Sequence, residues 1–230
     1  MVGYMIDCYM GENSIGKFCL PKHDAISDTI AAGEIFDPQV VEVISTYSGR
    51  VALDLGANIG QMTVLLSKNF ETVYAFEANP ELIPILKENL KLNNVNNVII
   101  IEKAVWNESG IQLPFPIPDG RYLSYGSYGV IPNETGARTL ESIAIDDLNI
   151  ENVDFIKSDI QGADLRGMQG ATQTILKNKP VILTEYEQNL VSLFNESMED
   201  YKDFAKSVGY KIERQISDNI IIGPDPTIYQ

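Results

Sequence analysis

Residues 51–64, Val-Ala-Leu-Asp-Leu-Gly-Ala-Asn-Ile-Gly-Gln-Met-Thr-Val, could bind a small molecule. They run from an apolar strand through a glycine-punctuated turn into a helix. Gly56 and Gly60 lack a Cβ, so the main chain can turn sharply and lie against a ligand, toward which the first N–H groups of the helix point. Asn58 stands where the dinucleotide fingerprint G-x-G-x-x-G has its middle glycine. The spacing therefore disfavours a pyrophosphate site.

Two acidic residues indicate which ligand the turn binds. Asp54, at the end of the first strand, would repel a pyrophosphate but suits the ammonium and sulfonium of S-adenosylmethionine. Glu77 ends the next apolar run, 23 positions after Asp54, where a carboxylate can accept both ribose hydroxyls. Any α/β protein can carry a glycine-rich turn and a later acid, so the prediction depends on both acids and Asn58 together. The predicted residues for this methyl donor are Asp54, Gly56, Ala57, Asn58, Gly60, Glu77, Ala78 and Asn79.

Asp159 and Glu185 follow two further predicted strands and could carry the reaction. The carboxyl ends of parallel strands meet at one crevice, so both should face the same pocket as Asp54 and Glu77. Transfer of a methyl group to an alcohol needs a general base, and a divalent cation such as Mg²⁺ could acidify the hydroxyl further. We expect Asp159 and Glu185 to be the base, metal ligands or both. Alternatively, Asp159 binds the donor's ammonium and Glu185 anchors the turn after its strand.

His23, the single histidine of the chain, is a third catalytic candidate, because only an imidazole titrates near neutral pH without perturbation. It precedes a predicted helix in the first 50 residues, which we expect to form a lid and part of the substrate wall over the carboxyl ends of the strands. A histidine in such a loop can equally be an exposed surface residue.

Residues 107–135 are rich in Gly, Pro, Ser and Tyr and show no helical period. Long irregular insertions in compact domains usually serve a function. Tyr122, Tyr125 and Tyr128, beside Arg121, could form a platform for a sugar or aromatic acceptor, because a phenol offers an apolar face and a hydroxyl together. The alternative is a solvated loop whose tyrosines pin it to the core.

Alternating strands and helices must position these residues. The predicted fold is α/β, a seven-stranded, mostly parallel, doubly wound, Rossmann-like sheet with an antiparallel C-terminal strand pair. The expected core strands are 51–55, 72–77, 98–104, 153–157, 180–184, 210–215 and 219–222, and the expected helices are 61–68, 80–93, 163–177 and 197–208. Before them we expect a strand at 16–21 and one or two short helices within 28–45.

The chain of 230 residues suits a single domain. We divide it into the lid segment 1–50, a donor-binding half 51–106, an acceptor-side insertion 107–135 and a second half 136–230. A net charge of −15 works against binding a phosphate backbone, so no nucleic acid partner is expected. Without a signal peptide or a membrane-spanning run, the expected location is the cytoplasm. Two cysteines, Cys8 and Cys19, with no C-x-x-C pair, indicate neither a disulfide framework nor a zinc site.

Several motifs together resemble the FkbM family of S-adenosylmethionine-dependent methyltransferases. They are Leu53-Asp-Leu-Gly-Ala-Asn-Ile-Gly60, Ala75-Phe-Glu-Ala-Asn-Pro80, Asp154-Phe-Ile-Lys-Ser-Asp-Ile-Gln-Gly-Ala-Asp164 and Leu183-Thr-Glu185, and the resemblance runs from about residue 24 to about residue 215. It implies a class I fold and O-methylation, often of a hydroxyl on a sugar or a secondary metabolite. It also implies that Ala104 and Val105 border the adenine.

The family's Lys-x-Asp-x-Glu-Gly-Ala-Glu motif is only partly kept. Lys157, Asp159, Gly162 and Ala163 match it, whereas Gln161 and Asp164 replace glutamates, and the change to Gln161 removes one charge from the rim of the pocket.

The leading hypothesis is an O-methyltransferase that acts on a glycan or a sugar-containing small molecule through a hydroxyl, as in polysaccharide biosynthesis. A donor-binding module with little or no turnover is an alternative, to which Gln161 gives some support. A methyltransferase acting on protein or RNA is another, and it would require a basic groove. The sequence does not indicate an oligomeric state.

Overall fold

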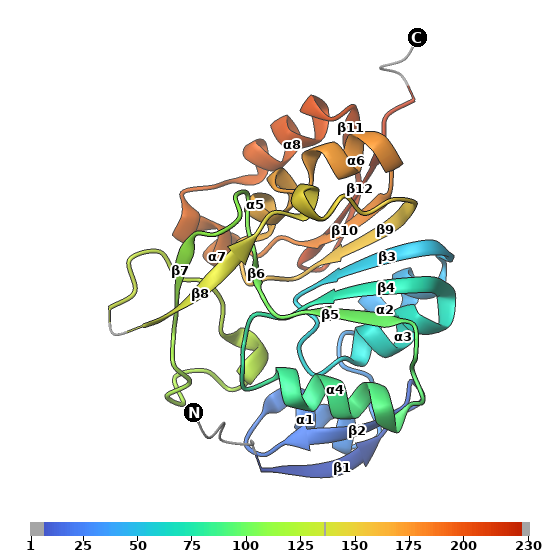
Figure 1. The fold of residues 1–230 in the computed structure, drawn as a ribbon, viewed down its shortest axis with the longest axis vertical. Helices are drawn as coiled ribbons and strands as arrows, with labels where there is room; N and C mark the ends of the chain where they lie inside the picture. Colours follow the sequence, from blue (N-terminus) through green and yellow to red (C-terminus); the bar gives the residue numbers. More distant parts are fainter. Residues whose placement is uncertain (1–6, 136, 227–230) are drawn as a thin grey trace.

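The structure is a computed structural model that describes residues 7–135 and 137–226. Its centre is a seven-stranded sheet in the order β11-β12-β10-β9-β3-β4-β5 (Figure 1). The strands are β3 (Gly49–Leu55), β4 (Phe70–Phe76), β5 (Val98–Ile101), β9 (Val153–Ser158), β10 (Val181–Glu185), β11 (Tyr210–Ile216) and β12 (Asn219–Pro224). All neighbours are parallel except β12, which is antiparallel to β10 and β11. The predicted fold class is confirmed.

Helices cover both faces of this sheet. The helices after the first N-terminal hairpin are α1 (Ala25–Ala31), α2 (Pro38–Ser45), α3 (Gln61–Asn69), α4 (Ile83–Leu92), α5 (Asp164–Gln169), α6 (Thr172–Asn178), α7 (Gln188–Val191) and α8 (Met198–Ser207). Helices α5, α6 and α8 share one apolar cluster with the sheet, and α2 and α3 share another. Side chains alternate along a strand, so both faces of the parallel strands are apolar.

The single helix expected over 163–177 is in fact two helices, α5 and α6. The break lies at Gly170, which packs so closely against Trp106 that a Cβ would lie 2.0 Å from the Trp106 carbonyl oxygen. Glycine also weakens a helix interior relative to alanine. A tertiary contact therefore divides a segment whose apolar period suggested one continuous helix.

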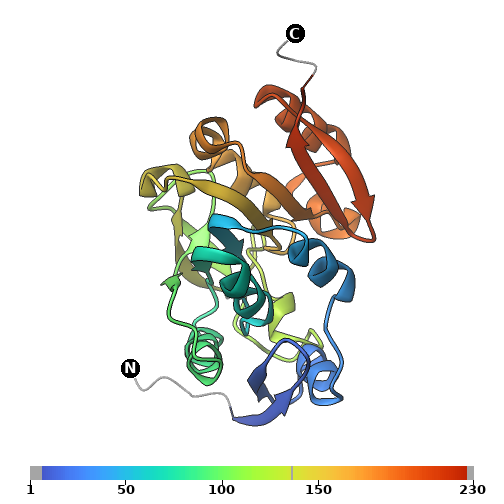
Figure 2. The same cartoon turned by 90° about the vertical axis from the view of Figure 1, so that its right-hand side faces the viewer.

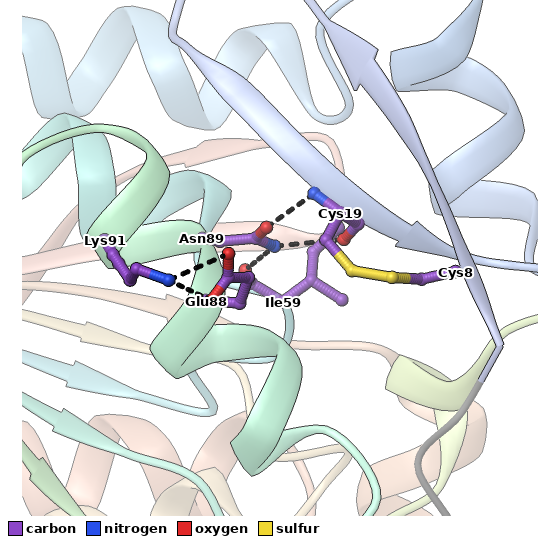
Figure 3. Close-up of a disulfide and its surroundings, with 6 residues drawn as sticks. All are labelled: Cys8, Cys19, Ile59, Glu88, Asn89 and Lys91. Carbon is purple, nitrogen blue, oxygen red and sulfur yellow. Dashed lines mark hydrogen bonds and ion pairs between the residues drawn. A yellow bond between two sulfur atoms is a disulfide. The ribbon is translucent and has the colours of Figure 1, made fainter.

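The N-terminal segment begins with an antiparallel hairpin of β1 (Cys8–Glu12) and β2 (Lys17–Pro21), at the opposite end of the molecule from β11 and β12 (Figures 1 and 2). The interpretation that the cysteines form no disulfide was wrong, because Cys8 and Cys19 are bonded across the hairpin with their Cα atoms 5.6 Å apart (Figure 3). The pairing escaped the sequence because β1 was not predicted. Disulfides are rare in cytosolic proteins, and the cytoplasmic location stays a prediction.

Asn89 of α4 fixes this hairpin to the rest of the fold. Its side-chain oxygen accepts the N–H of Cys19 at 2.6 Å, and its amide nitrogen donates to the carbonyls of Cys19 and Ile59 (Figure 3). Because Asn89 is fully buried, these bonds are shielded from water. They connect the hairpin directly to the turn that follows β3.

Between β5 and β9 the chain forms a small sheet in the order β6-β8-β7, made of β6 (Ala104–Val105), β7 (Gln112–Phe115) and β8 (Arg138–Ile143). The described residues also form the short 3₁₀ helices η1 (Tyr125–Ser127), η2 (Ile145–Leu148) and η3 (Ser192–Phe194). The irregular segment after β7 lies beside the carboxyl ends of the central strands (Figure 1). Among the helices of the described chain, none has the length and apolar character that crossing a bilayer would require.

Candidate active site

The order of strands reverses between β3 and β9, and ligands of open α/β sheets bind outside the carboxyl ends at such a point. The turn after β3 is built for this position. Gly56, Asn58 and Gly60 all have left-handed backbone angles, with φ values of 80°, 54° and 93°. A Cβ on Gly56 would lie 1.9 Å from the carbonyl oxygen of Asp159. Only glycine at residue 56 lets the first turn approach the end of β9 so closely.

A cavity opens beside this turn, and we call it the first cavity. Most of the residues expected around the donor line it, together with the apolar side chains Phe76, Phe115 and Val130. The predicted residues on its wall are Gly56, Asn58, Glu77, Ala78, Ala104, Val105, Tyr125, Tyr128 and Asp159. A cavity with apolar walls and a few convergent polar groups is typical of a ligand site.

Glu77 lies at the wall of the first cavity, just after β4, and is 7% exposed. One carboxylate oxygen accepts the N–H of Asn58 at 2.6 Å, and the other accepts the N–H of Asn79 at 2.7 Å. Burial raises the pKa of Glu77 to about 7, although these two amides and Lys157 lower it. Each oxygen keeps a lone pair that can accept a further hydrogen bond.

Asp54 does not line the first cavity, contrary to the direct contact with a donor ammonium that we expected. It is fully buried, with one oxygen accepting the Thr63 hydroxyl at 2.6 Å and the other 3.4 Å from the Lys157 ammonium. Lys157 also donates to the Gly56 carbonyl and lies 3.7 Å from Asp159. Asp54 therefore contacts neither cavity directly, and its partner Lys157 lines a neighbouring cavity rather than the first. The motif named Lys157, but we assigned it no role.

Asp159 and Glu185 are brought together at the ends of β9 and β10. Gln161 lies between them, with its amide nitrogen 3.0 Å from Asp159 and 3.4 Å from Glu185. Burial, followed by the nearby charge of Asp159, raises the pKa of Glu185 well above its usual range. Glu185 therefore carries a proton near neutral pH, and Asp159 is the better-placed base of the two.

The predicted Mg²⁺ site does not fit these residues. In the described part of the chain, no three His, Cys, Asp or Glu side chains lie close enough together to hold a metal ion. The neighbours of Asp159 are the Gln161 amide and the Lys157 ammonium, which are hydrogen-bond donors rather than ligands. A cation already supplies the positive charge that we expected from a metal.

A second cavity adjoins the first on the side of α1 and α2. The two share Gly56, Asn58 and Asp159, so they meet at the end of β9. The rest of the second cavity is lined by Ile26, Phe36, Asp37, Val40, Ala57, Ile59, Gln61, Met62, Lys157 and Asn219. Asp37 escaped the sequence analysis, and its only signal was its place before Pro38 at the start of a helix.

Other predicted residues lie away from both cavities. Asn79 is buried and accepts hydrogen bonds from the Glu81 N–H and the Arg138 guanidinium, and Gly60 is the N-cap of α3. His23 is exposed, because its left-handed φ of 58° turns the chain so that its neighbour Asp24 points inward instead. The position of His23 does not support the catalytic role that we expected for it.

The expected acceptor platform is divided. Tyr125 and Tyr128 line the first cavity, but the Tyr128 hydroxyl is engaged with the backbone of residues 119 and 120. Tyr122 packs edge-on against Tyr128 and lines neither cavity. Arg121 is exposed and paired with Asp119 and Glu134. Tyr128 fits the alternative that we weighed, in which a tyrosine pins the loop to the core. Tyr125 faces the cavity, as a residue of an acceptor platform would.

Comparison with solved structures identifies the class of this fold as that of Rossmann-like class I methyltransferases. The chain superimposes on TYW2 of Methanocaldococcus jannaschii in complex with AdoMet with a TM-score of 0.51 and 18% identity, over 96% of this chain and 86% of that one. A methyltransferase FkbM from Methylobacillus flagellatus KT gives a TM-score of 0.51 and 17% identity, over 86% of this chain and 52% of that one. Identities this low establish the fold alone.

Residues 54–212 match the family described as the methyltransferase FkbM domain, and the chain belongs to this family of S-adenosylmethionine-dependent methyltransferases. Among curated proteins, it is 47% identical over 53 residues to a tRNA (guanine(37)-N(1))-methyltransferase, Trm5b, of Pyrococcus abyssi. It is 39% identical over 85 residues to a tRNA(Phe) (4-demethylwyosine(37)-C(7)) aminocarboxypropyltransferase of M. jannaschii. These matches cover 23% and 36% of this chain but only 16% and 34% of the relatives.

Proposed function

We propose that this methyltransferase transfers the methyl group of S-adenosylmethionine to a hydroxyl of a small acceptor, such as a sugar-containing metabolite. The supporting observation is that two cavities meet at Asp159. The first cavity offers a carboxylate and apolar walls to a nucleoside. The second offers polar and apolar groups to an acceptor.

In the first cavity, Glu77 accepts the ribose hydroxyls, and Ala104 and Val105 lie against the adenine. The main chain at Gly56 and Asn58 follows the amino-acid end of the donor toward Lys157, whose ammonium attracts the donor's carboxylate. Asp54 holds Lys157 in place. Donor binding therefore depends on a buried ion pair below the cavity as well as on the residues that line it.

The acceptor enters the second cavity and presents its hydroxyl toward Asp159. The oxygen attacks the methyl carbon opposite the sulfur, the carbon–sulfur bond breaks with its electron pair returning to sulfur, and Asp159 takes the hydroxyl proton. Asp37 and Asn219 can bind other polar groups of the acceptor. Glu185, whose pKa is raised by burial and which lines neither cavity, does not take the proton in this scheme.

Methyl transfer to RNA is a second candidate, and the named tRNA-modifying relatives favour it. Two features oppose it. The chain carries a net charge of −15, and the second cavity is lined by the carboxylates of Asp37 and Asp159, which would repel a phosphate backbone. A small acceptor without a phosphate backbone suits these charges better.

A labelling experiment separates the candidates. The protein is incubated with methyl-labelled S-adenosylmethionine and either a small-molecule extract or total tRNA, and the label is followed after separation. We expect label in small molecules and roughly a hundredfold slower transfer by Asp159→Asn, since a general base typically contributes that much. Asp218→Asn, which changes an exposed aspartate in the turn between β11 and β12, is the charge-matched control. Label in tRNA, or an unimpaired Asp159→Asn, would reject the proposal.

A further inference from the structure

We propose that Asp24 is a positioning residue that latches residues 116–135, here called the flap, over the first cavity and so limits donor exchange. This inference rests on the proposed function, because it takes the first cavity as the donor site. The flap reaches the cavity with Tyr125, Gly126, Tyr128, Gly129 and Val130. A donor bound in this cavity would therefore lie against the flap.

The carboxylate of Asp24 divides its two oxygens between two parts of the fold. One oxygen caps α1 by accepting the N–H and the hydroxyl of Ser27, at 2.8 and 3.0 Å. The other accepts the Ser124 hydroxyl and the Tyr125 N–H of the flap, both at 2.7 Å. Asp24 is 2% exposed, so these four donors satisfy a charge that water barely reaches.

The latch lies at the point where the flap enters the cavity. The N–H of Ala25, next to Asp24, donates to the flap carbonyl of Leu123 at 2.8 Å. A Cβ on Gly126 would lie 2.1 Å from the Asn58 amide nitrogen and 3.1 Å from the Ile26 side chain. Because Ile26 lines the second cavity, the latch holds the flap against the boundary between the two cavities.

The remainder of the flap is bonded largely to itself. The Tyr128 hydroxyl accepts two N–H groups, from residues 119 and 120, and Arg121 pairs with Asp119 and Glu134. Residues 119–134 would keep these bonds if they moved together, although Tyr128 and Val130 are also buried in an apolar cluster that includes Phe115. When the unit moves away, Asp24 loses two hydrogen-bond donors, so opening carries an energetic cost. The latch therefore adds to the cost of opening the first cavity, together with the apolar packing of Tyr128 and Val130.

Asp24→Asn tests the latch with little effect on the helix cap. Asparagine is as good a helix cap as aspartate. Its amide nitrogen is a donor, however, so it cannot accept the hydrogen bonds of the Ser124 hydroxyl and the Tyr125 N–H in the flap. We expect amide hydrogen exchange in a peptide containing Tyr125 to be about tenfold faster than in the wild type, because a bond to a charged group is lost. S-adenosylhomocysteine, the donor product, should dissociate about tenfold faster in stopped-flow measurements.

Ser27→Ala is the matched control, because it removes a partner of Asp24 on the helix side only. It should leave exchange at Tyr125 and product dissociation within about twofold of the wild type. Ser124→Ala removes a flap-side partner of Asp24, together with the bond that the Ser124 hydroxyl accepts from the Gly126 N–H, and should accelerate both with the Asp24 carboxylate intact. Thermal unfolding midpoints show whether any change reflects general loss of stability.

The outcomes separate the two proposals. Equal exchange at Tyr125 in the wild type, Asp24→Asn and Ser124→Ala would reject the latch, whatever the protein binds. If amide hydrogen exchange at Tyr125 is faster in these variants but S-adenosylhomocysteine dissociates at the wild-type rate, the latch does not control the exchange of the donor. A wild type that does not bind S-adenosylhomocysteine would reject the proposed function, and with it control of donor exchange, while the hydrogen-exchange result would still decide the latch.

Discussion

Binding of S-adenosylhomocysteine should strengthen as the pH rises through about 7, because Glu77 changes charge there. Burial holds the pKa of this carboxyl at about 7 in the free protein, above its ordinary 4.5. The ionised form can accept both ribose hydroxyls, whereas the protonated form has lost an acceptor site. Lys157 favours the ionised form of Glu77, and the charge of Asp54 opposes it.

The size of the effect follows from the pKa. A group with a pKa of about 7 is ionised to about one tenth at about pH 6 and to about nine tenths at about pH 8. The dissociation constant should therefore fall roughly ninefold over this range, or about 1.3 kcal/mol. Glu77→Gln cannot ionise, so its profile should lack this step. At about pH 8, Glu77→Gln should bind S-adenosylhomocysteine at least about tenfold more weakly than the wild type, because a hydrogen bond to a charged group is lost.

Stability should change in the opposite direction. The folded-state pKa of Glu77 lies above the unfolded value, so the free protein holds more protons than the unfolded chain between pH 4.5 and about 7. The free energy of unfolding contributed by Glu77 is fully present below this window and is lost as the pH rises through it. Chemical denaturation of Glu77→Gln should lack this loss. Donor affinity and stability thus respond to the same proton with opposite signs.

Isothermal titration at three pH values provides the assay. The control is Glu71→Gln, which changes an exposed glutamate on β4, the strand that precedes Glu77. The control should follow the wild-type profile. If wild-type affinity is equal at about pH 6 and pH 8, the titration of Glu77 in this range does not govern binding. If Glu77→Gln also binds as tightly as the wild type, Glu77 does not contact the ribose.

Three further changes test the framework of the site. Gly56→Ala should lower the free energy of unfolding, measured in urea, by at least about 2 kcal/mol. The reason is that φ at residue 56 is 80° and an alanine Cβ would meet the Asp159 carbonyl. A variant as stable as the wild type would contradict this close approach. Lys157→Met should cost about 3–5 kcal/mol in the same assay, because Asp54 is left as an unpaired buried charge; a smaller loss would mean that Asp54 takes up a proton. Cys8→Ser should lower the free energy of unfolding by about 2–3 kcal/mol, because the disulfide is lost. Reduction of the wild-type disulfide should cause the same loss of stability unless the hairpin unfolds independently.

The fold could be predicted because its signals are local. Each buried parallel strand is a short apolar run, and acids and glycines mark where the strands end. The exceptions are local signals that a distant contact overrides. Gly170 divides a predicted helix because Trp106 packs against it from another part of the chain. Cys8 and Cys19 are bonded because a hairpin that the pattern did not reveal places them on adjacent strands.

The sequence indicated which residue types form the site, but not which residues contact each other there. The turn after β3 and Glu77 do border a cavity, and their spacing had indicated this. Asp54 was expected to contact the donor, yet it lies beside Lys157 in the parallel register of β3 and β9. The register of strands about 100 positions apart leaves no trace in the sequence, and neither does the bond between Asp24 and Ser124. Such pairs require the folded chain.

The acids at the strand ends, Asp54, Asp159 and Glu185, avoid mutual repulsion in two different ways. Asp54 and Asp159 share the ammonium of Lys157, whereas Glu185, farther from that cation, keeps its proton. Only Asp159 is both half-exposed and placed where the cavities meet. A donor that carries a positive sulfonium would bring a second cation to this point, whereas the product has lost the sulfonium charge and keeps only its ammonium. The carboxylates would therefore attract the donor more strongly than the product.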